Sequence, residues 1–489
     1  MPEQNDLELL LRSQTPIIVI ESLEEPRILQ LFTGLGLRLG QPVFKWSVTE
    51  GLKRQELDFG SEDLHQDPGD ALKHIKAHGQ PGLYLLLDFH PYTQDPVHVR
   101  LIKEIAQSYA AIPRTLVFIS CRLDIPLEVK HLSARFDLQL PDRASIKRLI
   151  LEEAQAWQAR SQKAVSADPK AVEQLATNLT GVSASDVRRL VRSAIEDDGA
   201  IRHDDLPKVM KAKYDLINQE GLISFEYDTA RFSDVAGLVH LKQWLEARQK
   251  LFHRSGAGLD RLKGIMLLGV QGSGKSLAAK AVAGTFGVPL LRLDFGNLYN
   301  KYIGETEKNL RVALATAETM APCVLWMDEI EKGIAPSHSD DGLSQRILGT
   351  LLTWMAENRS GVFVVATSND IQRLPPELIR KGRLDEIFFV DLPNRESRRE
   401  IFNIHLRRRN QAPSGFDLAA LAQASEGFTG AEIEQAIVSS LYSAHSREEA
   451  LNTEYLLDEL ERTSPLSVVM SEKVAWLRAW AAERTVSAG

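Results

Sequence analysis

Residues 267–280, LLGVQGSGKSLAAK, contain the spacing Gly-x-x-x-x-Gly-Lys-Ser, which starts at Gly269. A strand-like apolar run precedes the pattern and a helix-like run follows it, which is the setting that this loop requires. Glycines let the backbone wrap closely around a phosphate, and the N-terminus of the following helix adds partial positive charge. Lys275 would place an ammonium group on the β- and γ-phosphates, and Ser276 would offer its hydroxyl to Mg²⁺.

This pattern predicts a site for ATP and Mg²⁺, and the alternative is a Gly-rich turn with a surface lysine. Two carboxylates follow the apolar run CVLWM at 323–327. Asp328 is expected to hold Mg²⁺ through water, and Glu329 to polarise the attacking water as a general base. Glu331 is expected to be a solvated neighbour. The loop residues expected to bind the nucleotide are Gly269, Val270, Gln271, Gly272, Ser273, Gly274, Lys275, Ser276 and Leu277.

Polar residues also follow the next apolar runs. Asn369, near the end of VFVVATSND at 362–370, is placed to orient the attacking water, and a strand-end cap is the alternative. Arg380 and Arg383 stand three residues apart at an expected helix end. A planar guanidinium can stabilise charge on the transferring phosphoryl group, so both are candidate catalytic residues; salt bridges are the alternative.

Short β-rich runs and helical segments alternate around these residues, which predicts a parallel sheet covered by helices. The strand candidates are Ile265–Leu268, Leu290–Leu293, Val324–Met327, Val362–Ala366 and Ile387–Val390. The helix candidates are Lys275–Phe286, Glu305–Thr319 and Ser344–Asn358. We therefore expect an α/β ATPase core at 222–393, followed by a helical lid and C-terminal helices at 394–489.

The first half of the chain repeats this order. Its strand candidates are Ile17–Ile20, Val43–Trp46, Leu83–Leu87 and Leu116–Ser120. Two passages also recur: 134–150, ARFDLQLPDRASIKRLI, matches 382–402, and GVSASDVRRLV at 181–191 matches GFTGAEIEQAI at 427–437. Two ordered matches at similar separations predict a duplicated module, with its first copy at 1–215.

The first copy lacks the residues that phosphate chemistry needs. Asp88 is read as the counterpart of Asp328, with Phe89 in place of the catalytic glutamate. Arg135 corresponds to Arg383 and is expected to form a surface salt bridge. Three carboxylates follow the first strand, where like charge would repel ATP: Glu21, Glu24 and Glu25. The first module is therefore expected to serve ring assembly, substrate recruitment or regulation.

These residues carry a resemblance to the AAA branch of the AAA+ ATPases, over about residues 222–489. RFSDVAGL at 231–238 looks like the family's segment that lines the adenine pocket, which adds Val235 and Gly237 to the nucleotide site. GFTGAEIE at 427–434 resembles the AAA lid motif, which adds Gly430 and Ala431. The whole chain looks most like the two-part AAA proteins first described as a hypothetical chloroplast reading frame and found also in bacteria.

The resemblance implies the α/β class: tandem AAA+ modules, each a parallel-sheet P-loop core plus helical lid, the first degenerate. It implies a homo-oligomeric ring, usually a hexamer, in which the two arginines reach the neighbouring subunit's nucleotide. The triplet Tyr302, Ile303 and Gly304 resembles a pore loop that grips an extended polypeptide; packing of Tyr302 under the next helix is the alternative. The expected function is ATP-driven remodelling of a protein partner, and the alternative is an assembly switch or scaffold without threading.

Length and composition set the remaining expectations. A chain of 489 residues is long enough for several domains. The net charge of −8 creates no global positive field, which disfavours a nucleic-acid partner. The sequence has no bilayer-length apolar run and no signal-peptide pattern, so the cytoplasm is expected and no membrane partner. Cys121 and Cys323 both lie in apolar runs and are expected to be buried free thiols.

Overall fold

The computed structural model describes residues 2–55, 65–218, 221–226, 235–252, 261–298, 305–334, 343–380 and 382–489. They form two compact units. The first unit comprises Met1–Pro141 with Ser183–Asp186, and the second comprises Asp142–Val182 with Val187–Gly489. The second unit therefore holds most of a helical segment that the sequence assigns to the first module. The module limits at 215, 222 and 394 stay predictions.

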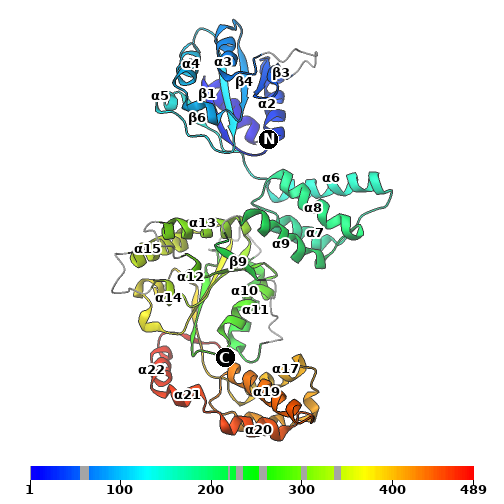
Figure 1. Ribbon diagram of the computed structural model, residues 1–489, viewed down its shortest axis with the longest axis vertical. Coiled ribbons are helices and arrows are strands. Elements are labelled where there is room, and N and C mark those ends of the chain that lie inside the picture. Colours follow the sequence, from blue (N-terminus) through cyan, green and yellow to red (C-terminus); the bar gives the residue numbers. More distant parts are fainter. Residues whose placement is uncertain are drawn as a thin grey trace. The chain divides into compact units, whose positions relative to one another are not determined.

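The first unit is built on a six-stranded sheet in the order β3-β2-β4-β5-β1-β6 (Figure 1). All neighbouring strands are parallel except β2 and β3. The strands are β1 (Ile17–Glu21), β2 (Val43–Ser47), β3 (Gly51–Arg54), β4 (Gly82–Leu87), β5 (Arg114–Ser120) and β6 (Ser133–Arg135). The helices are α1 (Pro2–Arg12), α2 (Glu25–Leu39), α3 (Pro68–Ala77), α4 (Pro96–Gln107) and α5 (Leu127–Lys130). Apolar side chains cover both faces of the sheet and bury it between these helices.

The second unit begins with a small helical bundle. Its elements are α6 (Arg143–Ser161), α7 (Pro169–Asn178), α9 (Leu206–Ile217), the short strands β7 (Ser166–Ala167) and β8 (Ala200–Ile201), and α8 (Ala184–Asp198), whose first residues group with the first unit. Apolar residues of α6, α7, α8 and α9 form one continuous core. Lys213 of α9 is fully buried and donates from Nζ to the carbonyls of Asn178 at 2.8 Å and Thr180 at 2.6 Å.

A seven-stranded sheet follows, in the order β15-β14-β10-β13-β12-β11-β9. The strands are β9 (Ile223–Glu226), β10 (Gly264–Gly269), β11 (Leu290–Leu293), β12 (Cys323–Met327), β13 (Val362–Ser368), β14 (Glu386–Val390) and β15 (Val486–Ser487). All neighbours are parallel except β9 and β11. The helices within this core are α10 (Val239–Phe252), α11 (Lys275–Phe286), α12 (Phe295–Leu298), α13 (Glu305–Met320), α14 (Glu331–Ile334), α15 (Leu343–Glu357) and α16 (Pro376–Ile379).

Helices cover both faces of this sheet (Figure 1). One apolar cluster joins the sheet to α10 and α11, and a second joins its other face to α12, α13 and α15. The helices after β14 are α17 (Arg395–Arg408), α18 (Leu418–Ala424), α19 (Gly430–Ser446), α20 (Thr453–Arg462), α21 (Leu466–Val469) and α22 (Ser471–Ala482). Because its strands are parallel and feed into helices, the carboxyl ends of β10, β12 and β13 meet at one edge of the sheet.

The two sheets share one strand order, which confirms the predicted tandem α/β architecture. Five neighbouring parallel strands run β2-β4-β5-β1-β6 in the first unit and β11-β12-β13-β10-β14 in the second. If these five strands are numbered by their order along the chain, both sheets have the spatial order second, third, fourth, first and fifth. The recurring lid passages also match locally, because Gly181 and Gly427 both have left-handed backbone, at φ 86° and 81°. These common features support the duplication inferred from the sequence.

Every predicted strand and helix is present, with ends that differ by at most two residues. The strands β3, β6, β7, β8, β9 and β15 were not predicted. Cys323 is buried as expected, whereas Cys121 is exposed, so the expectation of two buried thiols is wrong for Cys121. Cys121 directly follows the end of β5, where the chain leaves the core.

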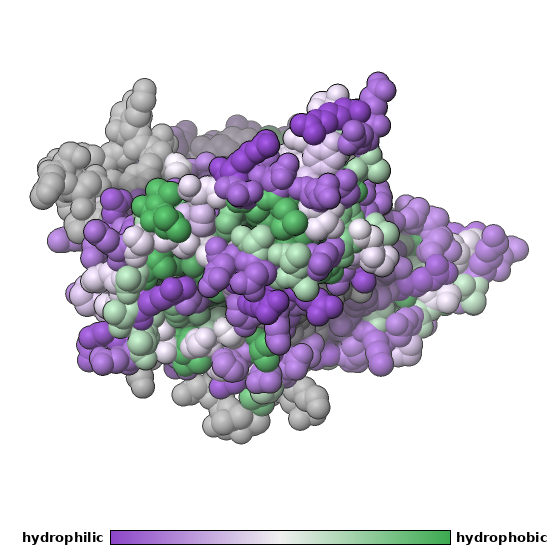
Figure 2. All heavy atoms as spheres, turned by 90° about the horizontal axis from the view of Figure 1, so that it is seen from below, coloured by the Kyte–Doolittle hydropathy of each residue, from purple (hydrophilic) through white to green (hydrophobic). Residues whose placement is uncertain are grey.

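No helix in the described ranges is long and apolar enough to cross a membrane. Most of the surface seen in Figure 2 is polar, with smaller apolar areas between the polar side chains. Three of the most exposed large apolar side chains in the second unit, Tyr442, Val468 and Val469, lie on α19 and α21.

Candidate active site

The loop between β10 and α11 has the backbone that the Gly-rich pattern predicts. Gly272 and Gly274 have positive φ values of 78° and 96°, which L-residues rarely adopt. Gly269 passes so close to β14 that a Cβ atom there would lie 2.0 Å from the carbonyl oxygen of Val390. α11 begins directly after the loop, at Lys275, so its first N–H groups point toward the space that a phosphate would take.

Lys275 folds back onto its own loop. Its side chain is buried, and its Nζ donates to the carbonyls of Gly269 at 2.9 Å and Val270 at 2.7 Å. Burial lowers the pKa of the Lys275 ammonium to about 8, against the attraction of nearby carboxylates, first among them Glu331. The loop is thus held in shape by the cation that would bind the phosphates.

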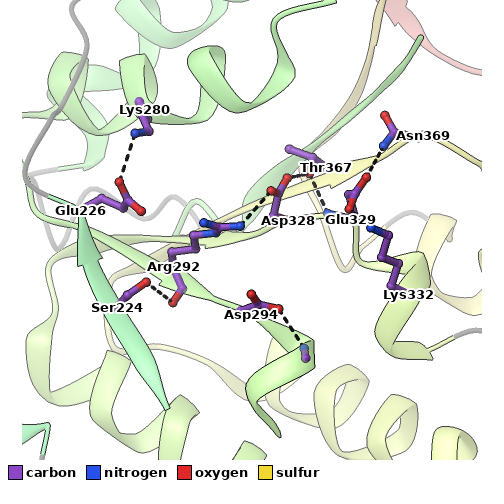
Figure 3. A network of polar contacts seen from close by, with 11 residues as sticks. Ser224, Glu226, Lys280, Arg292, Asp294, Asp328, Glu329, Lys332, Thr367 and Asn369 are labelled. Carbon is purple, nitrogen blue, oxygen red and sulfur yellow. Dashed lines mark hydrogen bonds and ion pairs between the residues drawn. The ribbon is translucent and has the colours of Figure 1, made fainter. Parts of the chain in front are cut away.

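Asp328 and Glu329 follow β12 at the same edge of the sheet (Figure 3). Thr367, at the end of β13, forms hydrogen bonds with both residues. Its Oγ1 donates to Asp328 Oδ1 at 2.7 Å and accepts from the backbone N–H of Glu329 at 3.0 Å. Glu329 has a left-handed backbone, with φ 46°, which turns the chain away from the strand.

Asn369 lies next to the predicted base. Its Nδ2 donates to Glu329 Oε1 at 2.8 Å, while Lys332 forms an ion pair with the other carboxylate oxygen (Figure 3). The backbone N–H of Asn369 donates to Glu331 Oε1 at 2.9 Å. Glu331 is only 4% exposed, so the expectation that it is solvated is wrong. The error arises because the chain turns into α14 at Glu331, which carries this side chain beneath the strand ends.

Two further residues at this edge were missed by the sequence analysis. Arg292 of β11 reaches toward Asp328, with Nη2 at 3.4 Å from Oδ2 (Figure 3). Lys473 of α22 forms an ion pair of 3.2 Å with Asp370, the neighbour of Asn369. Only the pairing of distant strands and helices reveals these contacts, so no local pattern could have indicated them.

The C-terminal helices close one side of the site. A cavity of about 50 Å³ separates the loop from α21 and α22. It is lined by Val270, Gln271, Asn369, Leu466, Met470, Lys473, Val474 and Leu477. α21 is tied to the lid because the N–H of Leu466 donates to Glu432 Oε1 at 2.7 Å.

The donors at the strand edge fit Mg²⁺. Mg²⁺ prefers hard oxygen ligands and keeps several of its waters, so one or two protein oxygens plus the phosphates suffice. Ser276 supplies a hydroxyl in the first turn of α11, and Asp328 supplies Oδ2, the carboxylate oxygen that Thr367 does not bond and that faces Arg292. These two residues are therefore the ones that would hold the ion.

Comparisons with known proteins agree with this geometry. Residues 265–392 match the ATPase family associated with various cellular activities (AAA). Residues 3–138 and 144–220 match the N-terminal and second domains of SpoVK-like AAA ATPases. An uncharacterised AAA domain-containing protein, ycf46, of Pyropia yezoensis is 36% identical over 98% of this chain and 97% of its own length.

The chain belongs to the AAA family of ATPases. The ycf46 protein of Guillardia theta is 35% identical over 97% of this AAA chain and 94% of its own length. The proteasome-activating nucleotidase of Aeropyrum pernix is 38% identical over 39% of this chain and 48% of its own. Nucleotide binding and ATP hydrolysis are accordingly activities of this AAA protein.

The residues predicted to line the adenine pocket and the predicted lid residues of this AAA protein have different neighbours in the structure. The N–H of Gly237 donates to Glu400 of α17 at 3.2 Å, and Val235 is buried nearby in the chain. The N–H of Ala431, in the first turn of α19, donates to the carbonyl of Gly272 at 3.3 Å. The structure therefore brings the predicted lid residues Gly430 and Ala431 directly against the P-loop.

The predicted arginines lie away from the P-loop of their own chain. The carbonyl of Gly382 accepts from Lys263 Nζ at 2.6 Å, which places Gly382, next to Arg383, at the start of β10. The P-loop begins at the other end of this strand, at Gly269. Five residues at about 3.3 Å each separate the two ends of the strand by roughly 16 Å. Arg380 is exposed, and Arg383 Nη1 is buried without an acceptor in the described part of the chain.

The triplet Tyr302, Ile303 and Gly304 lies outside the described residues. The segment that leads to it is described up to α12, where Asp294 caps the first turn by accepting from the N–H of Gly296 at 2.8 Å. The gripping role of the triplet therefore stays a prediction.

The first unit holds carboxylates with partners of their own where the second has its P-loop. Glu21 forms an ion pair with Arg135, as expected for that arginine. Glu24 is buried and accepts from Arg27 at 2.8 Å and from the N–H of Ala184, which belongs to this unit, at 2.6 Å. These contacts hold carboxylates at this place, where like charge would disfavour a phosphate, so loss of the phosphate site in this unit stays a prediction.

The predicted alignment of Asp88 with Asp328 is wrong by one residue. Asp88 and Glu329 both have left-handed backbone, at φ 48° and 46°, and a fully buried apolar residue follows each, Phe89 and Ile330. Asp88 therefore stands at the place of Glu329, the predicted base, and an apolar residue stands at the place of Asp328. The first unit thus lacks the carboxylate that would hold Mg²⁺.

Proposed function

We propose that this AAA protein forms a ring, hexameric by analogy with the family pattern, and uses Mg²⁺-dependent ATP hydrolysis to remodel or thread a protein partner. Glu329 would act as the general base, and Asn369 would orient the attacking water beside it. Lys275 would exchange its loop carbonyls for the β- and γ-phosphates. When bound at Ser276 and Asp328, Mg²⁺ would neutralise charge on those phosphates.

The observation that carries the ring is the separation of the arginines from their own P-loop. Arg380 and Arg383 lie at the opposite end of β10 from Gly269, while Arg383 keeps a buried Nη1 without an acceptor in the described ranges. A guanidinium placed this way can reach the phosphates of another chain more readily than its own. An arginine finger supplied from a neighbouring subunit would complete each site at the seam between two chains.

A protein partner is favoured over a nucleic acid by the net charge of −8. The name of the Aeropyrum pernix relative, a proteasome-activating nucleotidase, states a protein target for that relative. In this chain the triplet Tyr302, Ile303 and Gly304 would hold the polypeptide, and the first unit would recruit it or regulate the ring. The cytoplasm is the compartment in which we expect this to occur.

A particle-mass measurement on the Glu329→Gln protein tests this function directly. With Mg²⁺ and ATP this variant should assemble into rings that retain ATP and capture a partner in a pull-down. Lys275→Ala protein under the same conditions should stay unassembled. Tyr302→Ala is then tested for remodelling of the captured partner. If rings of this variant keep normal ATP turnover and still remodel the partner, the switch or scaffold alternative is favoured. A single-chain mass with saturating ATP would refute the ring.

A further inference from the structure

Arg292 is the one cation that β11 places beside the predicted metal ligand. The strands β11 and β12 pair Arg292 with Trp326, so Asp328 lies two residues further along the same face of the neighbouring strand. Arg292 Nη2 is 3.4 Å from Asp328 Oδ2 (Figure 3). The guanidinium carbon of Arg292 lies 4.9 Å from the centroid of the Trp326 ring. The register of the two strands therefore places Arg292 next to Asp328.

The carboxylate of Asp328 is oriented for this contact. Oδ1 accepts from Thr367 Oγ1 at 2.7 Å, which leaves Oδ2 to face the guanidinium. Arg292 Nε is buried and has no acceptor among the described residues. The guanidinium is therefore incompletely bonded, and the one hydrogen bond described for it is the long contact of 3.4 Å to the predicted metal ligand.

We propose that Arg292 is a positioning residue that serves as the counter-ion of Asp328 until the metal is bound, and that it must then release this carboxylate. The inference rests on the proposed Mg²⁺-dependent hydrolysis. A guanidinium at this distance and a divalent cation repel each other across the same carboxylate. Arg292 therefore weakens the metal site when it faces Asp328 and keeps the carboxylate neutralised before ATP arrives.

The release would be transmitted along β11 into α12. Asp294, two residues after Arg292, caps α12, and α12 leads to the predicted pore loop. A second contact joins α12 to the segment after Asp328. Gly333 of α14 packs so closely against Phe295 of α12 that a Cβ atom on Gly333 would lie 2.2 Å from the Phe295 ring. The segments after Arg292 and after Asp328 thus both contact α12. A shift of Asp328 would therefore be passed to α12, the segment before residues 299–304.

The neighbouring ion pair provides a matched control. Lys280 Nζ lies 3.1 Å from Glu226 on β9, and this pair is also partly buried (Figure 3). Neither residue contacts Asp328, Glu329 or Asn369 in any described hydrogen bond or ion pair. Lys280→Gln removes one positive charge near the site without touching the metal ligand, so it reports the effect of net charge alone.

The experiment measures binding of a fluorescent ATP analogue by the full-length Glu329→Gln protein over a titration of free Mg²⁺. Arg292→Gln and Arg292→Met, which keeps an apolar stem on Trp326, should each lower the half-saturating Mg²⁺ concentration by about fivefold or more. Arg292→Lys should stay near the parent, and Lys280→Gln should change it by less than about twofold. Thermal unfolding checks that each variant is folded.

An unchanged or raised Mg²⁺ requirement in folded Arg292→Gln and Arg292→Met proteins would overturn the inference, because Arg292 would then be a structural ion pair or a support of the metal site. Equal shifts in the Arg292 and Lys280 variants would also overturn it, since net charge would explain them. Binding is measured without turnover or partner, so it is independent of remodelling. Loss of Mg²⁺-dependent ATP binding in the parent protein would instead refute the proposed function and this inference together.

Discussion

Asn369 donates its side-chain N–H to Glu329 at 2.8 Å and its backbone N–H to Glu331 at 2.9 Å. One residue directly after β13 is therefore bonded to two of the three carboxylates in the segment that follows β12. The first contact sets the amide beside the predicted base, and the second fixes the backbone that carries this amide. We therefore expect Glu331 to act on hydrolysis through Asn369.

Glu331→Ala should lower kcat by about 10- to 100-fold with little change in ATP affinity, because the amide of Asn369 loses its fixed position. Glu331→Gln retains a carbonyl oxygen for the Asn369 N–H and should keep much of the activity. The Glu331→Ala/Asn369→Ala double variant should be no slower than Asn369→Ala alone. Additive losses in this double-mutant cycle would show that Glu331 acts independently of Asn369.

ATP affinity should fall as the pH rises above 8. Burial holds the pKa of Lys275 at about 8 in the nucleotide-free protein, and the phosphates bind its charged form. Above that pH, binding must take up a proton, so the dissociation constant should rise by up to about tenfold per pH unit. Lys275→Arg, which stays charged, should show a flatter profile between pH 7 and 9.5 in Glu329→Gln protein. Parallel profiles for the two proteins would contradict this assignment.

Arg380→Ala should bind ATP normally and hydrolyse it about 1,000-fold more slowly or worse, because transition-state charge would lose its cation. Lys275→Ala protein should also be inactive, since it cannot hold the nucleotide. A mixture of the two should regain activity, because some seams would pair an intact P-loop with an intact arginine. The measurement is ATPase rate against mixing ratio, with Arg447→Ala in place of Arg380→Ala as the control. Absence of any recovery would count against a shared site.

Lys213 should make the second unit more stable at higher pH. Burial lowers the pKa of Lys213 to about 7 in the fold, against about 10.4 in the unfolded chain. At pH values between these two pKa values, the unfolded chain binds more protons than the folded chain. The free energy of unfolding therefore rises with pH, by at most about 1.4 kcal/mol per pH unit. Burial also raises the pKa of Cys323, the nearby thiol, to about 12, which keeps it protonated over this range.

Denaturant unfolding of wild-type and Lys213→Met proteins between pH 7 and 9.5 measures this slope. The difference in the free energy of unfolding should move in favour of the wild type as the pH rises. Lys208→Met, on the exposed side of the same helix and paired with Asp197, provides the control and should add no such slope. A difference that stays flat or falls with pH would refute the assigned pKa.

The regular elements and the P-loop could be predicted because their signals are local. An apolar run such as 323–327 specifies a buried strand, and Gly272 and Gly274 specify a backbone that few other residues tolerate. β15 could not be predicted in this way, since its two residues become a strand only by pairing with β14. Arg292 was missed for the same reason, because its significance depends on the register between two strands.

Glu331 and Asp88 show a second limit. Both lie where a strand gives way to a turn, and a single left-handed residue there decides which side chains point into the site. Sequence spacing alone placed Glu331 in solvent and aligned Asp88 with the wrong carboxylate. The backbone angles of Glu329 and Asp88 correct both predictions.

The most direct test of the asymmetry between the two units is the number of nucleotides that each chain binds. Glu329→Gln protein at saturating Mg²⁺ and ATP should hold one ATP per chain, measured by equilibrium dialysis with radiolabelled nucleotide. Adding Lys275→Ala should abolish this binding, because the first unit presents carboxylates where the second presents its P-loop. Two nucleotides per chain, or Mg²⁺-dependent binding that survives Lys275→Ala, would contradict the account.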